Sequence, residues 1–108
     1  MSTIDNFERM LSAGRDSALL RFSLGNEYLK ADAPERAAEH LARAVEFDPD
    51  YSAAWKFYGK ALTAAGRSMD AAEAYRRGIE TAERRGDRQA AKEMQVFLRR
   101  LESTGRQR

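Results

Sequence analysis

Residues 55–75 read WKFYGKALTAAGRSMDAAEAY, and residues 21–41 read RFSLGNEYLKADAPERAAEHL. Placed 34 residues apart, the two stretches align Gly25 with Gly59, and the Ala-Ala-Glu run at residues 37–39 with that at 71–73. The large apolar positions keep step throughout. An internal period of this length indicates a repeat architecture in which each unit is one supersecondary element.

The sequence around these stretches favours helices. It is rich in Ala and Arg, which are strong helix formers, and it has only two prolines. Apolar residues recur at three- and four-residue spacing, whereas no segment alternates with a period of two, so we expect no sheet. The expected helices cover residues 3–13, 17–31, 34–47, 51–65, 68–85 and 88–102.

Glycines and prolines mark the breaks between these helices. Pro34 suits the first turn of a helix, where its missing N–H costs nothing. Pro49 is a firm stop, and Gly66 suits a helix end. Ser68 is the expected cap of the fifth helix. Glu83 stands where a second proline would close the repeat, so that helix is expected to run on toward Arg85.

The second repeat, Trp55-x-x-Tyr58-Gly59-x-x-Leu62 followed by Ala71-x-x-x-Tyr75, resembles the tetratricopeptide repeat family. The first repeat carries Leu24-Gly25-x-x-Tyr28, Ala37-x-x-x-Leu41 and Pro49 in the same order. The resemblance implies an all-α, right-handed α-solenoid of antiparallel helix pairs with about six helices. Gly25 and Gly59 are expected where the two helices of a unit cross, because a side chain there would push the backbones apart.

The expected organisation is one domain over residues 1–108. It comprises an N-terminal half-unit at 3–15, repeat 1 at 18–51, repeat 2 at 52–85, a capping helix at 87–102 and a frayed tail at 103–108. The last helix fits a shift of 36 residues better than one of 34. A cap is expected because the end unit of a solenoid has an open apolar face, which Ala90, Met94, Phe97, Leu98 and Leu101 would cover.

The resemblance also implies a concave groove, lined by the first helix of each unit, that binds a peptide or a partner helix. The predicted groove residues are Phe22, Asn26, Lys30, Lys56, Lys60 and Lys92. The chain's four lysines all fall in this set, and they are either a binding feature or ordinary solvated positions. Phe22 either holds an apolar side chain of the ligand or packs against the first helix.

A basic groove would favour an acidic peptide or a C-terminal carboxylate. Some family members grip such a carboxylate with a set of Lys, Asn and Arg side chains, and Asn26 matches one element of that set. Phe22 and Phe57 stand where a Lys and an Asn would be expected. The full clamp is therefore absent.

Charge is divided unevenly along the chain. Residues 1–50 carry six Lys/Arg and ten Asp/Glu, a net charge of −4, whereas residues 51–108 carry thirteen and seven, a net charge of +6. This division offers an alternative function, self-association or complex assembly without a peptide groove, including a homodimer. Nucleic-acid binding through the basic C-terminal half is a weaker alternative, because no aromatic residue is interleaved with its arginines and several glutamates are.

The composition argues against catalysis and cofactors. With no cysteine, the chain has no thiol nucleophile, disulfide or iron–sulfur ligand. His40, the only histidine, is expected on a solvated helix face, and no carboxylates near it have metal-ligand spacing. We find no catalytic constellation, metal site or cofactor motif, so an enzyme is not expected. No apolar run could span a membrane and the N-terminus has no signal pattern, so we expect a cytoplasmic protein.

Overall fold

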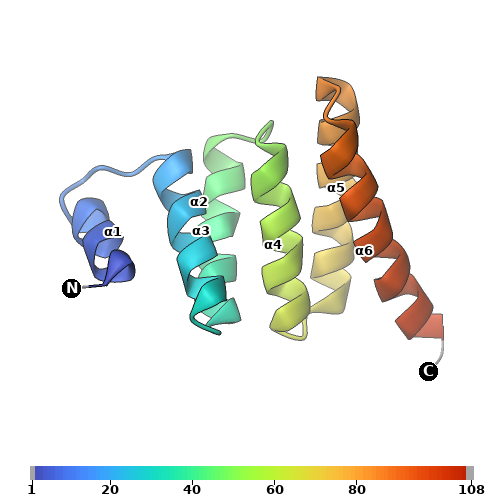
Figure 1. Cartoon of the computed structure of the whole chain (residues 1–108), viewed down its shortest axis with the longest axis horizontal. Coiled ribbons are helices and arrows are strands. Elements are labelled where there is room, and N and C mark those ends of the chain that lie inside the picture. The colour runs from blue at the N-terminus through green and yellow to red at the C-terminus, as the bar shows by residue number, and fades with distance from the viewer. Residues whose placement is uncertain (1, 107–108) are drawn as a thin grey trace.

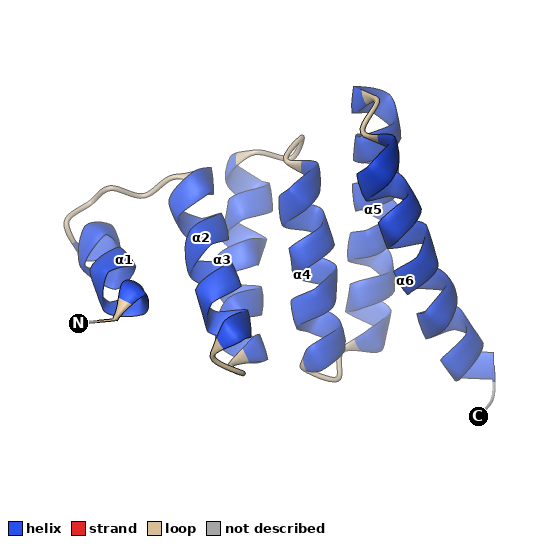
Figure 2. Cartoon of the chain, in the orientation of Figure 1, coloured by secondary structure: helices blue, strands red, loops and turns tan. Residues whose placement is uncertain are grey.

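The computed structural model describes residues 2–106, with side chains described for residues 2–104. This part of the chain forms six α-helices and no strand (Figure 2), which confirms the expected all-α class. The helices are α1 (Thr3–Ser12), α2 (Ala18–Lys30), α3 (Pro34–Phe47), α4 (Ser52–Ala64), α5 (Ser68–Arg85) and α6 (Arg88–Arg106).

The helices form a solenoid of two layers (Figure 1). The antiparallel pairs are α2 with α3 and α4 with α5, while α3 also contacts α4, and α5 contacts α6. In the view of Figure 1, α2, α4 and α6 lie in front and α3 and α5 behind. We call the surface formed by α2, α4 and α6 the front face. Because α6 contacts α4 as α4 contacts α2, α6 takes the place of the first helix of a third unit.

The spacing of the front helices changes along the chain. α2, α4 and α6 begin at residues 18, 52 and 88, so the first step is 34 residues and the second is 36. The difference arises in α5, which has 18 residues against 14 in α3 and is joined to α6 by Gly86 and Asp87 alone. With Glu83 in place of proline, α5 runs on to Arg85, as expected. Gly86 ends it in the left-handed conformation at φ 76°.

Side-chain caps fix the start of several helices. Ser2 and Asp5 form a capping box at α1, in which the Ser2 hydroxyl accepts from the Asp5 N–H at 3.1 Å. Ser17 caps α2 by accepting from the Leu20 N–H at 3.1 Å. The prediction that Ser68 caps α5 is wrong. The helix begins at Ser68 itself, so that Arg67 is the N-cap residue, and Arg67 makes no side-chain capping hydrogen bond.

The C-terminus also differs from expectation. The sequence predicts a frayed tail from Ser103, but α6 continues through Arg106; residues 107–108 lie outside the described part. Two side-chain contacts lie in its last turns. The Thr104 hydroxyl donates to the Arg100 carbonyl at 2.9 Å, and Glu102 pairs with Arg76 of α5 at 3.5 Å.

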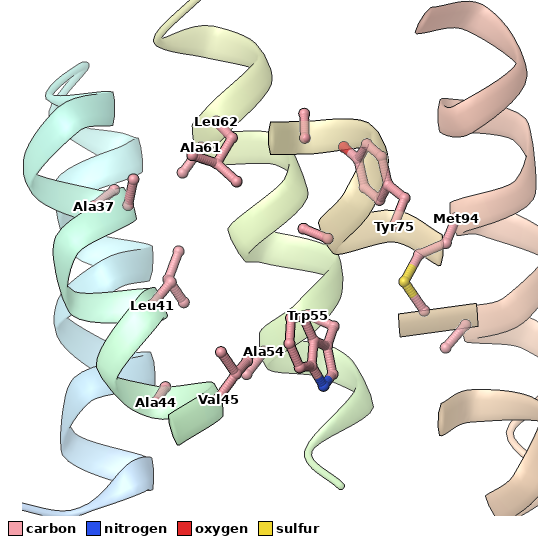
Figure 3. Packing of buried hydrophobic residues seen from close by; sticks show 14 of the residues in the cluster. Ala37, Leu41, Ala44, Val45, Ala54, Trp55, Ala61, Leu62, Tyr75 and Met94 are labelled. Atoms are coloured by element: carbon pink, nitrogen blue, oxygen red, sulfur yellow. The ribbon is translucent and has the colours of Figure 1, made fainter. Parts of the chain in front are cut away.

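The core runs between the two layers (Figure 3). Leu24, Leu41, Leu62 and Met94 are its largest fully buried side chains. Leu41 faces Gly25 so closely that a Cβ on Gly25 would lie 2.8 Å from Leu41 Cδ2. The close approach of α2 and α3 therefore depends on a residue without a side chain, as the aligned glycines predict.

The end of the solenoid is closed by α6. Met94 is fully buried and packs on Gly78 of α5, and Ala90 is buried as well. Phe97, Leu98 and Leu101 are only half-buried against the core. At the step of 36 residues, Gln95 takes the position of Gly59. A helix could not approach α6 there as closely as α5 approaches α4 at Gly59.

His40 corrects another expectation. Its side chain is only 12% exposed, because its ring stacks on Tyr28 at 5.4 Å and α1 lies over it. Arg21 Nη1 is 3.1 Å from Nδ1, and the carboxylate of Glu8 is 3.4 Å from Nε2. The arginine can only donate, so Nδ1 accepts and the proton of the neutral ring sits on Nε2. Asp16 holds Arg21 in place at 2.8 Å. This cluster docks α1 onto the first repeat.

Candidate functional site

The structure brings three of the six predicted groove residues together. Asn26 and Lys30 of α2 and Lys60 of α4 line a hollow of about 370 Å³ on the front face. Leu29 and Phe57 complete its lining. Both were missing from the predicted set. Helical spacing could have found them, since Leu29 lies three residues after Asn26 and Phe57 three before Lys60. We call this hollow the first hollow.

The first hollow combines apolar walls with one unsatisfied polar group. Leu29 and Phe57 are half-buried and pack against the core. The Asn26 carboxamide oxygen is buried and has no hydrogen-bond partner among the described residues. A buried acceptor without a donor costs free energy.

Lys60 differs from the other three predicted lysines, because its ammonium lies against aromatic rings from two helices. Its Nζ is 5.1 Å from the centroid of Phe57 and 5.5 Å from that of Phe97 in α6. No ion pair to Lys60 is found among the described side chains. The ammonium is therefore positioned by cation–π contacts and remains open to an anion.

Lys56 and Lys30 are already paired. Lys56 Nζ donates to Glu93 Oε1 at 2.8 Å, which ties α4 to α6. This hydrogen bond, joined by one from Gln89, lowers the pKa of Glu93 below its ordinary value. Lys30 donates to Glu27 within α2 at 3.1 Å, and its side chain is largely exposed. Lys30 and Lys56 therefore each already have a carboxylate partner, unlike Lys60.

Phe22 lies on the front face between α2 and α4. Its ring is 4.9 Å from that of Tyr51 and meets Phe57 edge-on at 5.5 Å. Phe22 and Tyr51 are both half-buried. Burial, followed by the smaller effect of the Asp48 charge, raises the pKa of Tyr51. Phe22 therefore extends the aromatic wall next to the first hollow.

Lys92 lies apart from the other predicted groove residues. It is exposed and lines a different hollow, of about 380 Å³, with Glu83, Gly86, Arg88, Ala91 and Gln95. α6 instead turns Glu93 toward Lys56 and Phe97 toward Lys60. Lys92 is not part of the lysine group around the first hollow.

A second hollow lies beyond Lys60. It measures about 230 Å³ and is lined by Thr63, Tyr75, Phe97, Arg100, Leu101 and Thr104. Thr63 follows Lys60 by three residues on α4, and Phe97 contacts the Lys60 ammonium. Arg100 lies over the Phe97 ring at 5.8 Å. The two hollows therefore flank Lys60 along the front face. Sequence reasoning did not find the second hollow, because its lining comes from three helices.

Residues 2–106 show neither a metal centre nor a membrane-spanning helix. No cluster of three or more His, Asp or Glu side chains could hold a metal ion. None of these helices is long and apolar enough to cross a membrane.

Known proteins resemble the chain in sequence and in fold. A TPR repeat-containing protein of Pseudomonas aeruginosa is 57% identical over 99 residues, 92% of this chain and 94% of that protein. A solved protein of Bordetella parapertussis matches with a TM-score of 0.82 and 43% identity, covering 96% of this chain and 90% of its own. A tetratricopeptide repeat domain protein of Salinibacter ruber matches with a TM-score of 0.74 and 32% identity, covering 82% and 98%. No protein-family model matches the chain.

Proposed function

We propose a function from the premise that this chain belongs to the tetratricopeptide repeat family. The fold supports a protein–protein interaction module in general. The proposal is that the front face is the working groove and binds a peptide or a partner helix, without catalysis and without a cofactor.

The observation that carries this proposal is the first hollow. It unites apolar walls from Leu29 and Phe57, an unpaired ammonium at Lys60 and a buried, unsatisfied acceptor at Asn26. Binding sites typically combine apolar walls with a few polar groups that fix the ligand's orientation. An acidic partner is favoured, because the open charge in the hollow is positive.

The chemistry of the groove argues against a dedicated C-terminal carboxylate clamp. Phe22 and Phe57 are in contact with each other, where the clamp would have a lysine and an asparagine. Asn26 is the one matching element. The groove therefore suits a side chain with apolar neighbours better than a bare terminal carboxylate.

Self-association remains the second candidate, on the strength of the charge division. End-to-end continuation of the repeat is disfavoured by Gln95 on α6.

Several basic residues of the C-terminal half are also engaged: Arg84 pairs with Asp50 at 2.7 Å, and Arg77 lies over Trp55 at 4.7 Å. Such pairing weakens the case for a phosphate-binding surface as well.

The proposed groove is tested with an array of cellulose-bound peptides probed with the full chain. Lys60→Glu should abolish or redirect binding, since it replaces the open ammonium with a carboxylate. Lys92→Glu is the matched control, because it makes the same charge change outside the hollow. Circular dichroism verifies that both variants remain helical. Binding that responds equally to the two substitutions would reject the first hollow as the site.

A further inference from the structure

A third hollow lies between α3, α4 and α5, on the side of the two rear helices of Figure 1. No Cα atom of α3 lies within 8 Å of one in α5, so side chains of α4 line the space between them. The hollow measures about 410 Å³, and its uncharged lining consists of Ala42, Val45, Trp55, Tyr58 and Ala74. We call it the back hollow.

In the first repeat, side chains of the protein itself fill the corresponding place. The imidazole of His40 stacks on Tyr28 and lies 3.1 Å from the guanidinium of Arg21. The carboxylate of Glu8 is 3.4 Å from its other nitrogen. When this position of the fold is filled, it therefore holds planar groups and charge.

The second repeat has smaller side chains at this position. A shift of 34 residues carries Glu8, Arg21 and His40 onto three residues that all line the back hollow, in order Ala42, Trp55 and Ala74. Two of the three have become alanines. The back hollow is therefore open where the first repeat has its own imidazole and carboxylate.

The carboxylates at the back hollow are not all paired. Asp70 pairs with Arg67 at 2.8 Å, and Glu46 pairs with Arg43 of its own helix at 3.2 Å. Glu73, which also lines the hollow, makes no ion pair or hydrogen bond among the described side chains. A cation can therefore pair with Glu73 without breaking an existing ion pair.

The aromatic rings of the back hollow favour the same class of ligand. Arg77 completes the charged lining, and its Cζ lies 4.7 Å from the centroid of the Trp55 ring. The neighbouring Tyr58 ring is half-buried, and no cation lies over it among the described side chains. A guanidinium stacks flat on an aromatic face and pairs with carboxylates, whereas an ammonium is a compact point charge.

From these features we propose that the back hollow receives an arginine side chain of a protein partner. The guanidinium lies against the Tyr58 ring and pairs with Glu73, in the place that the His40 ring takes in the first repeat. This site uses side chains other than those of the first hollow and prefers a ligand of the opposite charge. It therefore stands or falls independently of the proposed groove.

The experiment is an NMR titration of the 15N-labelled full chain with the capped tripeptide Ala-Arg-Ala. Amide signals around Tyr58 and Glu73 should shift and reach saturation. The indole signal of Trp55 should move with them, and it is unambiguous because the chain has one tryptophan. The same peptide with citrulline keeps the planar shape without the charge and should bind more weakly, as should a lysine peptide.

Three variants test the assignment. Ala74→His adds the side chain that the aligned His40 has and should abolish the saturable shifts by filling the hollow. Glu73→Gln should weaken binding of the arginine peptide roughly two- to fivefold, the effect of a solvent-exposed ion pair. Glu39→Gln is the matched control, because Glu39 aligns with Glu73 beside the filled position, and it should leave binding unchanged. Circular dichroism verifies that each variant is helical.

Several results would overturn the proposal. The arginine peptide could produce no saturable shifts, or shifts centred on carboxylates away from the back hollow. The citrulline peptide could bind equally well, or a phenylalanine peptide better, which would make the site apolar rather than cation-binding. Equal effects of Glu73→Gln and Glu39→Gln would also reject it. None of these results bears on the front face.

Discussion

Gly59 of α4 faces the ring of Tyr75 of α5 so closely that a Cβ built on Gly59 would lie 2.6 Å from both Cδ1 and Cζ of the ring. Tyr75 is itself 2% exposed, so its ring has little room to move. The aligned Gly25 stands in the same relation to Leu41. One missing side chain per repeat thus sets how closely the two helices of each unit pack.

Gly59→Ala should destabilise the protein by about 1–3 kcal/mol, the usual cost of overpacking a filled core. The better helix propensity of alanine offsets part of this cost. Thermal unfolding followed by circular dichroism measures the effect. In a Tyr75→Ala background the same substitution should cost little, because the obstructing ring is gone. Equal losses in both backgrounds would contradict the close contact.

Asp32→Gly should stabilise the protein. Asp32 is the one non-glycine residue with a positive φ in the described part of the chain, at 58°, and the aligned residue of the second repeat is Gly66, at 78°. An L-residue pays for the left-handed conformation and glycine does not, so the expected gain is about 0.5–1 kcal/mol. The reverse change, Gly66→Asp, should destabilise. Chemical denaturation measures the free energy of unfolding of both variants. If the two substitutions shift it in the same direction, the prediction is contradicted.

Acidification below pH 6.5 should weaken the docking of α1. Burial lowers the pKa of His40 below its ordinary 6.5, with Arg21 and Arg36 acting in the same direction and Glu8 and Glu39 opposing it. The unfolded chain therefore takes up a proton at higher pH than the folded chain. The stability contributed by neutral His40 is present above pH 6.5 and is lost as the pH falls through the lowered pKa. Denaturation midpoints between pH 7.5 and pH 5 measure this loss.

His40→Gln is the control for the pH effect, since it removes the titrating group and should flatten the slope in that window. The carboxylates with lowered pKa, Asp16 and Glu93, act at lower pH because their ordinary values are 3.8 and 4.5. A variant that loses stability on acidification as steeply as the parent would exclude His40 as the cause.

Truncations in α6 should follow burial. Met94→Ala, at a fully buried position, should cost about 2–5 kcal/mol. Phe97→Ala should cost less than the roughly 3–5 kcal/mol of a fully buried phenylalanine, because Phe97 is half-buried. Thermal melts of the two variants and the parent give the order. If α6 were instead a helix that docks only on a partner, both midpoints would stay within a degree or two of the parent.

The sequence predicted much of the candidate site as a set of positions, but it did not predict how the side chains are arranged. Asn26, Lys30 and Lys60 were predicted from their places in the repeat and do line one hollow. Lys92 was predicted with them, yet Glu93 is the residue that meets Lys56. At the step of 36 residues Lys92 is the counterpart of Lys56, and Lys56 points toward the next front helix, where it meets Glu93. No front helix follows α6 within residues 2–106, so Lys92 has no such partner there.

By itself, the sequence determined the helices, their pairing and where α5 would end. In a solenoid each unit contacts only its neighbours, so the period, the crossing glycines and the absence of a proline at Glu83 are local signals with local consequences. The tertiary structure alone decided the burial of His40, the pairing of Lys56 with Glu93 and the two hollows around Lys60. Each of these joins side chains from different helices, and the outcome depends on how each helix is rotated when packed, which a repeat pattern does not specify.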